Sequence, residues 1–334
     1  MKLLSHSNGL HTVEKEKINK VKFIKRIIIF IVILFATGFI IEMVNKTIDD
    51  RKYKSRFKYV RVEGNKLEYQ LKGSGEYTIV FDGNIGTNLH QWDNIYKTIE
   101  EESNVSVFRY NRSGYGFNDL KSAMTPEEQA KILKALLKKA GASGPYILVG
   151  EEYGSLIMTN FAKLYPDSVA GAILINPINE STLSDSDNNK IIRTKYYRSK
   201  IETIGANFSL TSLLSKMGLT MENPYFEENL DENEKEEFEC FKNKKTYRGA
   251  ISYELHNLYE KVSDSQSEGI LKNKPLYIIT DNADTSLVNM GDEGKTIVYE
   301  EKTLENSPYS MSNSDKVVTA INNVLKQAQK HSKN

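Results

Sequence analysis

The chain has 334 residues, of which 39% are hydrophobic and 27% are charged, and its formal net charge is +1. This composition is typical of a globular protein, and the balanced charge excludes the basic field expected of a nucleic-acid-binding protein. The single cysteine, Cys240, excludes an intramolecular disulfide.

An apolar segment lies near the N-terminus, where residues 27–41 read IIIFIVILFATGFII and contain neither charge nor proline. Taken as residues 27–44, the segment is long enough to cross a bilayer if the flanking basic side chains snorkel. Its apolarity on all faces argues against a buried core helix, and the apolar run continues past the small residues that a signal peptidase would require. The sequence therefore favours an uncleaved anchor, with a cleaved signal peptide as the alternative.

The charges beside this segment predict its orientation. Lysine and arginine cluster before it, and such clusters favour the cytoplasmic side of a membrane. Residues 1–26 are then a cytoplasmic basic tail, residues 45–57 a polar stalk, and residues 58–330 an extracytoplasmic domain. We expect a single-pass protein of the cell membrane whose partner through residues 27–44 is the lipid bilayer.

Strand and helix patterns alternate through the first part of the domain. Two alternating runs around Gly64-Asn65 predict a hairpin over 58–73. Thr125, Pro126 and Glu128 form the capping box of a helix that runs to Gly141. Continuous apolar runs predict buried strands at 77–82, 105–110, 146–150, 169–176, 275–280 and 295–301. This order predicts an α/β fold with a mostly parallel sheet and helices on both faces.

Between residues 178 and 272 the strand pattern disappears and the sequence is polar with helical periodicity. An insertion of this kind between two late strands predicts a helical cap over the carboxyl edge of the sheet, where ligands bind in such folds.

One stretch, ILVGEEYGSL over 147–156, has the outline of the G-x-S-x-G nucleophile elbow of a hydrolase. An apolar strand precedes Gly150, and a helical pattern follows Gly154. The serine position, however, is Glu152, and Glu151 precedes it.

Together with two further motifs, this stretch resembles the α/β-hydrolase family, and more narrowly a membrane-anchored bacterial branch of it. That branch reads D-A-G-L-G, Y-D-R-A-G-Y-G and G-P-Y-V-L-V-G-H-S. The corresponding stretches here are DGNIG (82–86), YNRSGYG (110–116) and GPYILVGEE (144–152). The resemblance covers about residues 58–325 and implies an α/β-hydrolase fold with a helical cap.

The same resemblance implies that the serine-hydrolase chemistry is lost. Glu152 stands at the serine position, and Pro308 is the most plausible counterpart of the catalytic histidine. The acid position is Asp281 or Asp284, but an acid without a base or nucleophile performs no such catalysis. A glutamate nucleophile would still need a histidine to activate water, and its extra methylene misplaces the oxygen.

Ser155, His90 and His256 are each considered as a catalytic or a packing residue. Ser155 follows the elbow on the next helix, and we interpret it as a small packing residue. His90, after the first strand of the parallel set, is interpreted as a packing histidine beside Trp92, with a place in the cleft as the alternative. His256 is interpreted as a residue of the cap.

Both glutamates fall at a predicted helix N-terminus, where backbone N–H groups favour carboxylates. The resemblance places the oxyanion hole there, formed by Tyr153 and the turn of Gly83, Asn84 and Ile85. One hypothesis is that the Glu152 carboxylate occupies this hole. The alternative is that Glu152 arose by drift after catalysis was lost.

The sequence thus favours a membrane-tethered hydrolase-fold protein without serine-hydrolase catalysis, which binds a small ligand or a protein partner. No cofactor and no metal are expected. The alternative is an active hydrolase of ester-like substrates that uses Glu152 with His90 and Asp281 or Asp284. A third possibility is a structural domain whose cleft is filled.

Overall fold

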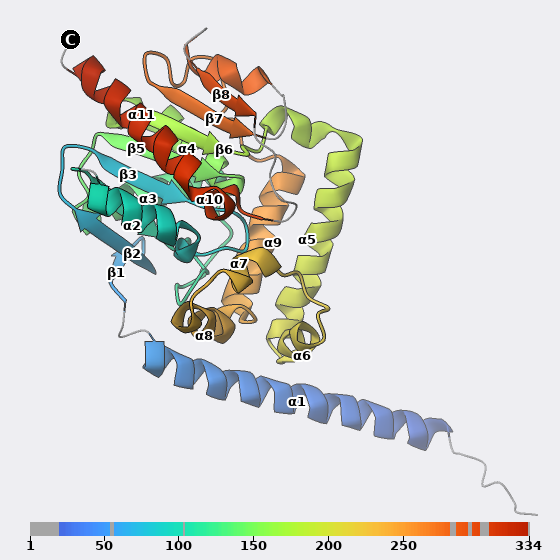
Figure 1. Ribbon diagram of the computed structural model, residues 1–334. Helices are drawn as coiled ribbons and strands as arrows, with labels where there is room; N and C mark the ends of the chain where they lie inside the picture. The colour runs from blue at the N-terminus through green and yellow to red at the C-terminus, as the bar shows by residue number, and fades with distance from the viewer. Residues whose placement is uncertain are drawn as a thin grey trace, which may run out of the picture.

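The computed structural model describes residues 20–53, 57–102, 104–280, 285–292, 296–300 and 307–332. Its centre is an eight-stranded sheet with the order β1-β2-β4-β3-β5-β6-β7-β8 (Figure 1). Strand β2 is antiparallel to its neighbours β1 and β4, and all other pairs are parallel. The strands are β1 (Tyr59–Val62), β2 (Asn65–Gly73), β3 (Thr78–Asp82), β4 (Ser106–Tyr110), β5 (Tyr146–Glu151), β6 (Val169–Ile175), β7 (Leu276–Thr280) and β8 (Ile297–Glu300).

Helices cover both faces of the sheet, as the alternating pattern predicts. On one face α2 (Asp93–Glu102) packs beside α11 (Ser314–Ser332), and on the other α3 (Pro126–Ala140) packs beside α4 (Tyr153–Leu164). The predicted capping box of α3 is confirmed, because Thr125 Oγ1 accepts a hydrogen bond from Glu128 N at 3.2 Å. Gly141 ends this helix in the left-handed conformation with φ 78°.

The chain between β6 and β7 forms a layer of helices beside the carboxyl edge of the sheet (Figure 1). We call this layer the cap. Its longest helices, α5 and α9, pack against each other. The cap helices are α5 (Ser186–Ala206), α6 (Leu210–Lys216), α7 (Pro224–Glu228), α8 (Glu232–Phe241) and α9 (Lys245–Glu260). A short helix, α10 (Tyr309–Ser312), precedes α11.

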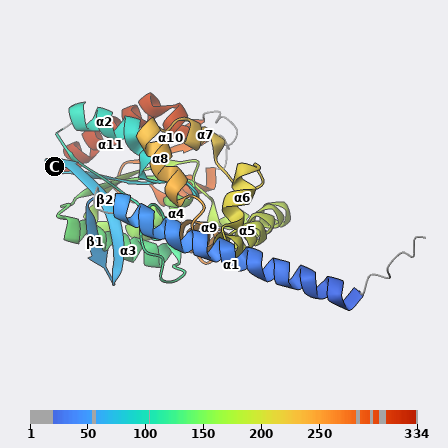
Figure 2. The same cartoon turned by 90° about the horizontal axis from the view of Figure 1, so that it is seen from below.

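Helix α1 (Lys20–Tyr53) crosses the lower side of the domain and extends beyond it (Figure 2). Its part Lys20–Asp49 is long and apolar enough to cross a membrane. The expected stalk over 45–57 differs from the structure, where the helix continues to Tyr53. This stretch contains no proline or glycine. Its end packs on the domain: Asp49 pairs with Lys244 of the cap at 2.9 Å, and the buried Tyr53 ring stacks on Phe117, which lies outside the cap, with ring centroids 5.3 Å apart.

Candidate functional site

The turn between β5 and α4 has the backbone of a nucleophile elbow. Glu152 lies at its apex with φ 45° and ψ −111°, a conformation that costs energy for any residue with a side chain. Its N–H donates to Ile175 O at 2.9 Å. The turn also needs glycine at 154, because a Cβ there would lie 2.3 Å from the Asp82 carbonyl oxygen. The strained turn of a hydrolase is therefore present without its serine.

Glu152 lines a cavity of about 970 Å³ between the sheet edge and the cap. The turn 84–86, the segment 176–179 and residues of α5, α8 and α9 also contribute to its wall. That the Glu152 carboxylate occupies the oxyanion hole stays a hypothesis. Glu152 makes no side-chain capping bond to the start of α4, and the Asn84 N–H of the turn donates to Gln91.

The Gln91 side chain binds the predicted oxyanion turn. Its side-chain oxygen accepts hydrogen bonds from Asn84 N at 3.0 Å and from Thr87 Oγ1 at 2.5 Å. Its amide nitrogen donates to Glu151 Oε2 at 2.7 Å and to Ser310 Oγ at 3.0 Å. Gln91 is buried, and both ends of its amide are satisfied. The backbone N–H of Asn84, in the predicted oxyanion turn, thus already has a hydrogen-bond acceptor within the protein.

Glu151 joins the elbow to the segment that would carry the catalytic histidine. Its carboxylate accepts from Tyr309 N at 2.5 Å, from Ser310 N at 3.3 Å and from the Ser310 hydroxyl. The side chain is fully buried, and burial raises the pKa of Glu151 to about 8 although the bonds from Ser310 and Tyr309 lower it. We call Glu151, Gln91 and Ser310, with the backbone N–H of Tyr309, the polar bridge.

A second buried network, centred on Arg112, binds the predicted oxyanion turn. Arg112 donates to Asp82 Oδ1 at 2.5 Å, to the carbonyls of Gly83 and Asn84, each at 2.9 Å, and to Glu254 of α9 at 2.7 Å. Burial raises the pKa of Glu254, against the attraction of Arg112. The network ties the cap to the sheet through buried charges.

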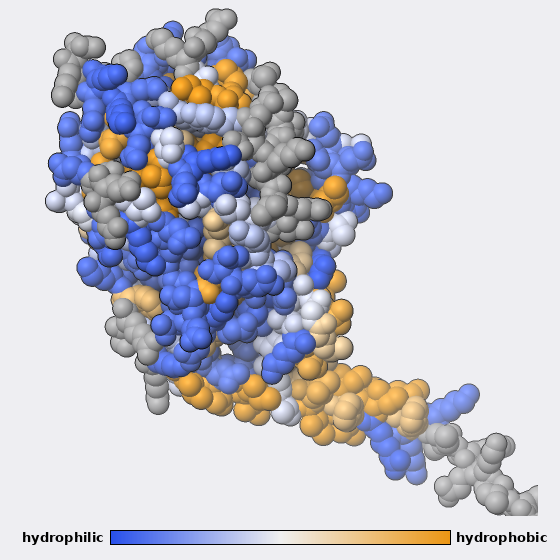
Figure 3. All heavy atoms as spheres, viewed as in Figure 1, coloured by the Kyte–Doolittle hydropathy of each residue, from blue (hydrophilic) through white to orange (hydrophobic). Residues whose placement is uncertain are grey.

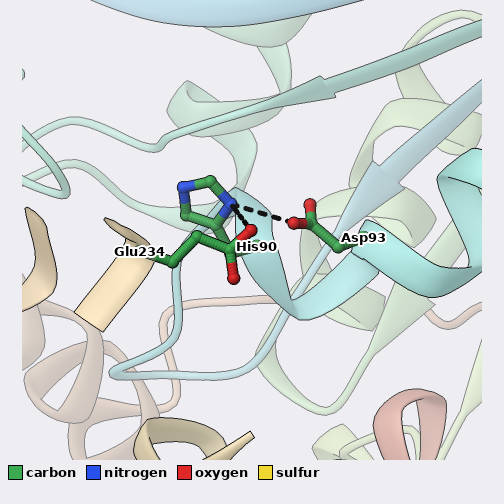
Figure 4. A group of neighbouring side chains, drawn as sticks. All are labelled: His90, Asp93 and Glu234. Carbon is green, nitrogen blue, oxygen red and sulfur yellow. Dashed lines mark hydrogen bonds and ion pairs between the residues drawn. The ribbon is translucent and has the colours of Figure 1, made fainter. Parts of the chain in front are cut away.

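His90 lies in a buried ionic cluster against the cap (Figure 4). Its Nδ1 is 3.2 Å from Asp93 Oδ2 and 3.3 Å from Glu234 Oε1 of α8, and its Nε2 is 3.8 Å from Glu237 Oε2. Burial lowers the pKa of His90, but Glu234 and Glu237 overcome this effect and raise it to about 9. The imidazolium is therefore the stable form at neutral pH.

Three of these side chains, His90, Asp93 and Glu234, are close enough to hold a metal ion. Their charges already have protein partners, however, because Arg109 pairs with Asp93 and the protonated His90 faces the glutamates. We interpret the group as an ionic contact between the sheet domain and α8.

Of the alternative catalytic set, the described residues Glu152 and His90 do not share the cavity. His90 does not line the cavity that Glu152 lines, and His256 packs against Tyr196 with ring centroids 5.0 Å apart. Asp281 and Asp284 lie outside the described residues.

The remaining predicted positions have structural contacts. Pro308 is buried at the start of α10, next to the Tyr309 N–H that binds Glu151. Ser155 is fully buried, and its hydroxyl donates to Glu152 O at 2.5 Å and accepts from Ile178 N at 3.2 Å. The serine hydroxyl therefore holds the backbone of the elbow.

Sequence reasoning missed Gln91, Arg112 and Ser310. Arg112 stands inside the quoted motif YNRSGYG, and an arginine shortly after a predicted buried strand was a usable signal. Gln91 and Ser310 are 219 positions apart, and no local pattern relates them.

Comparison with known proteins agrees with this architecture. The family described as the alpha/beta hydrolase fold matches residues 79–212. An uncharacterised protein of Bacillus subtilis (strain 168), YqjL, is 34% identical over 107 residues, which are 32% of this chain and 42% of the relative. The match thus spans less than half the length of that curated relative.

Several solved structures have a similar fold. The Cif epoxide hydrolase of Acinetobacter nosocomialis aligns with 18% identity and a TM-score of 0.62, over 85% of this chain and 96% of its own. The enol-lactonase of Burkholderia xenovorans LB400 aligns with 15% identity and a TM-score of 0.56, over 80% and 100%. A thermophilic esterase from Thermogutta terrifontis aligns with 16% identity and a TM-score of 0.54, over 81% and 97%. These matches, with the strand order and the elbow, show that the chain is an α/β-hydrolase-fold protein.

Proposed function

We propose that this protein is a membrane-tethered pseudohydrolase, which binds a small molecule or a protein partner through its cavity and cap and does not hydrolyse it. The polar bridge carries this proposal. Glu151, Gln91 and Ser310 connect the three segments that bear the nucleophile, the oxyanion turn and the histidine in a serine hydrolase. In this protein, hydrogen bonds join these three segments to one another.

The residues at the elbow support the same reading. A serine hydrolase needs a hydroxyl nucleophile activated by a neighbouring base. Glu152 stands at the apex, and the two described histidine side chains, His90 and His256, are engaged in contacts away from the cavity. The elbow backbone also has a structural role, because Gly154 lets α4 approach the end of β3 closely.

A cavity of this size suits a small organic molecule, since ligand sites commonly enclose several hundred Å³. Its wall combines apolar side chains such as Ile251 and Leu255 with polar ones such as Asn84 and Thr280. We therefore propose a ligand with both apolar and polar parts.

Membrane attachment is the second component of the proposal. The apolar part of α1 follows the basic residues Lys20, Lys22, Lys25 and Arg26, which favour the cytoplasmic side. The hydrolase-like domain then lies outside the cytoplasm.

Ligand binding can be tested with anilinonaphthalene sulfonate, an apolar dye with an anionic group. We expect the full chain in detergent to bind it saturably, and Ile178→Trp to weaken binding roughly tenfold because the indole fills part of the cavity. Val298→Trp on β8 places the same side chain outside the cavity and serves as the control. Equal binding by all three proteins would contradict a site in the cavity.

A further inference from the structure

The tip of the cap exposes a continuous apolar surface. On α5, Tyr197, Ile201 and Ile204 follow helical spacing and are 48%, 68% and 58% exposed. On α6 and just after it, the exposed apolar side chains are Leu210, Leu213, Met217 and Leu219. We call these seven residues the apolar tip. Soluble surfaces rarely gather so many large exposed apolar residues on two adjacent helices.

Helix α1 lies directly beside the apolar tip. Phe35 contacts Phe208 edge to face at 4.8 Å, and Ser209 Oγ donates to Gly38 O at 3.1 Å. A Cβ at Gly38 would lie only 2.0 Å from Phe208 O, so glycine is what permits this close approach. Figure 3 shows the apolar colour of α1 continuing onto the lower edge of the cap.

These contacts fall within the apolar segment of α1, not at its end. Phe35 and Gly38 lie inside residues 27–44, the part proposed to cross the bilayer. If this part of α1 crosses the bilayer, Phe208 and Ser209, which pack against it, lie in the same lipid environment. The backbone of α5 and α6 is helical there, so its polar groups are largely satisfied without water.

We propose that the apolar tip inserts into the lipid leaflet on the domain side of the membrane, beside α1. The proposal rests on the membrane anchor proposed above and adds a second membrane contact. Lys200 and Lys216 are exposed beside the tip and can extend their ammonium groups to the lipid phosphates. The continuity with α1 favours lipid over a protein partner or a second copy.

The test places an environment-sensitive nitrobenzoxadiazole label on single cysteines of the full chain, in a Cys240→Ala background. Leu213→Cys reports the tip and Leu34→Cys reports α1, because these leucines are 57% and 58% exposed. Lys138→Cys, exposed on α3, reports the solvated domain. Each protein is reconstituted in phosphatidylcholine–phosphatidylglycerol vesicles with or without doxyl-labelled lipid, and its unfolding midpoint is compared with that of the background.

We expect doxyl lipid to cause about a twofold loss of fluorescence at positions 213 and 34 and little loss at position 138. Quenching at 34 without quenching at 213 would overturn the inserted tip and leave the anchor intact. A blue-shifted but unquenched label at 213 would overturn it as well, in favour of a protein cover. Absence of quenching at both positions 213 and 34 would contradict the membrane anchor itself.

Discussion

At the scale of single residues, buried hydrogen bonds join the elbow to two distant segments of the chain. Glu151 and Gln91 are both buried, and each makes several hydrogen bonds to segments far away in the sequence. A buried polar group of this kind destabilises the fold when its partners are removed. The polar bridge therefore has a measurable structural role.

Replacing Gln91 tests that role. Gln91→Leu leaves Asn84 N and Thr87 Oγ1 without their shared acceptor, and we expect the free energy of unfolding to fall by about 2 kcal/mol or more. Denaturant titration of the full chain in detergent measures the change. Gln329→Leu, an exposed residue of α11, is the control and should change stability by about 0.5 kcal/mol or less. Equal effects of the two substitutions would show that the bridge is dispensable.

At the scale of elements, a buried ionic network fixes the cap. Helix α9 contributes Glu254 to Arg112, which also binds the turn after β3. Tyr115 adds a hydrogen bond from its hydroxyl to Glu254 at 2.5 Å. The cap is therefore a packed layer joined to the sheet through buried charges.

The substitution Glu254→Gln removes one charge from this network. Arg112 then keeps only Asp82 as a carboxylate partner, and we expect the free energy of unfolding to fall by about 3 kcal/mol. Glu260→Gln lies at the exposed end of the same helix and should leave stability nearly unchanged. A Glu254→Gln protein as stable as the unmodified chain would contradict a stabilising role of this network.

The elements themselves were predictable because each has a local signal. The apolar runs predicted β3 to β8, and the capping box predicted the start of α3 at Pro126. The elbow was predicted from Gly150 and Gly154 around Glu152. The polar bridge was not, because hydrogen bonds between Gln91, Glu151 and Ser310 depend on the folded arrangement of three distant segments. The end of α1 was missed for the same reason, since its contacts are with residues distant in the sequence, Lys244 and Phe117.

At the scale of the whole molecule, several buried groups bind protons more tightly when folded. Burial raises the pKa of Glu68 to about 7 and that of Glu151 to about 8, from an ordinary value of 4.5. Glu234 and Glu237 overcome the effect of burial and raise the pKa of His90 from 6.5 to about 9. All three shifts are in the same direction.

Stability should therefore decrease as the pH rises. Between its ordinary and its raised pKa, each group binds more protons in the folded protein than in the unfolded chain. Its contribution to the free energy of unfolding therefore decreases as the pH rises from the ordinary pKa to the raised one. We expect the melting temperature of the full chain in detergent to fall from pH 5 to pH 9, and Glu151→Gln to reduce the slope below pH 8. A melting temperature that rises through this range would contradict the buried protonation states.

The most direct test of the central claim is hydrolysis of an activated ester, para-nitrophenyl butyrate, by the full chain. The proposed pseudohydrolase predicts a rate no greater than that of heat-denatured protein, with Glu152→Gln and Ser155→Ala indistinguishable from the unmodified chain. Parallel incubation with a fluorophosphonate probe should leave the protein unlabelled. Turnover that survives Ser155→Ala and disappears in Glu152→Gln would contradict the proposal and identify Glu152 as a catalytic residue.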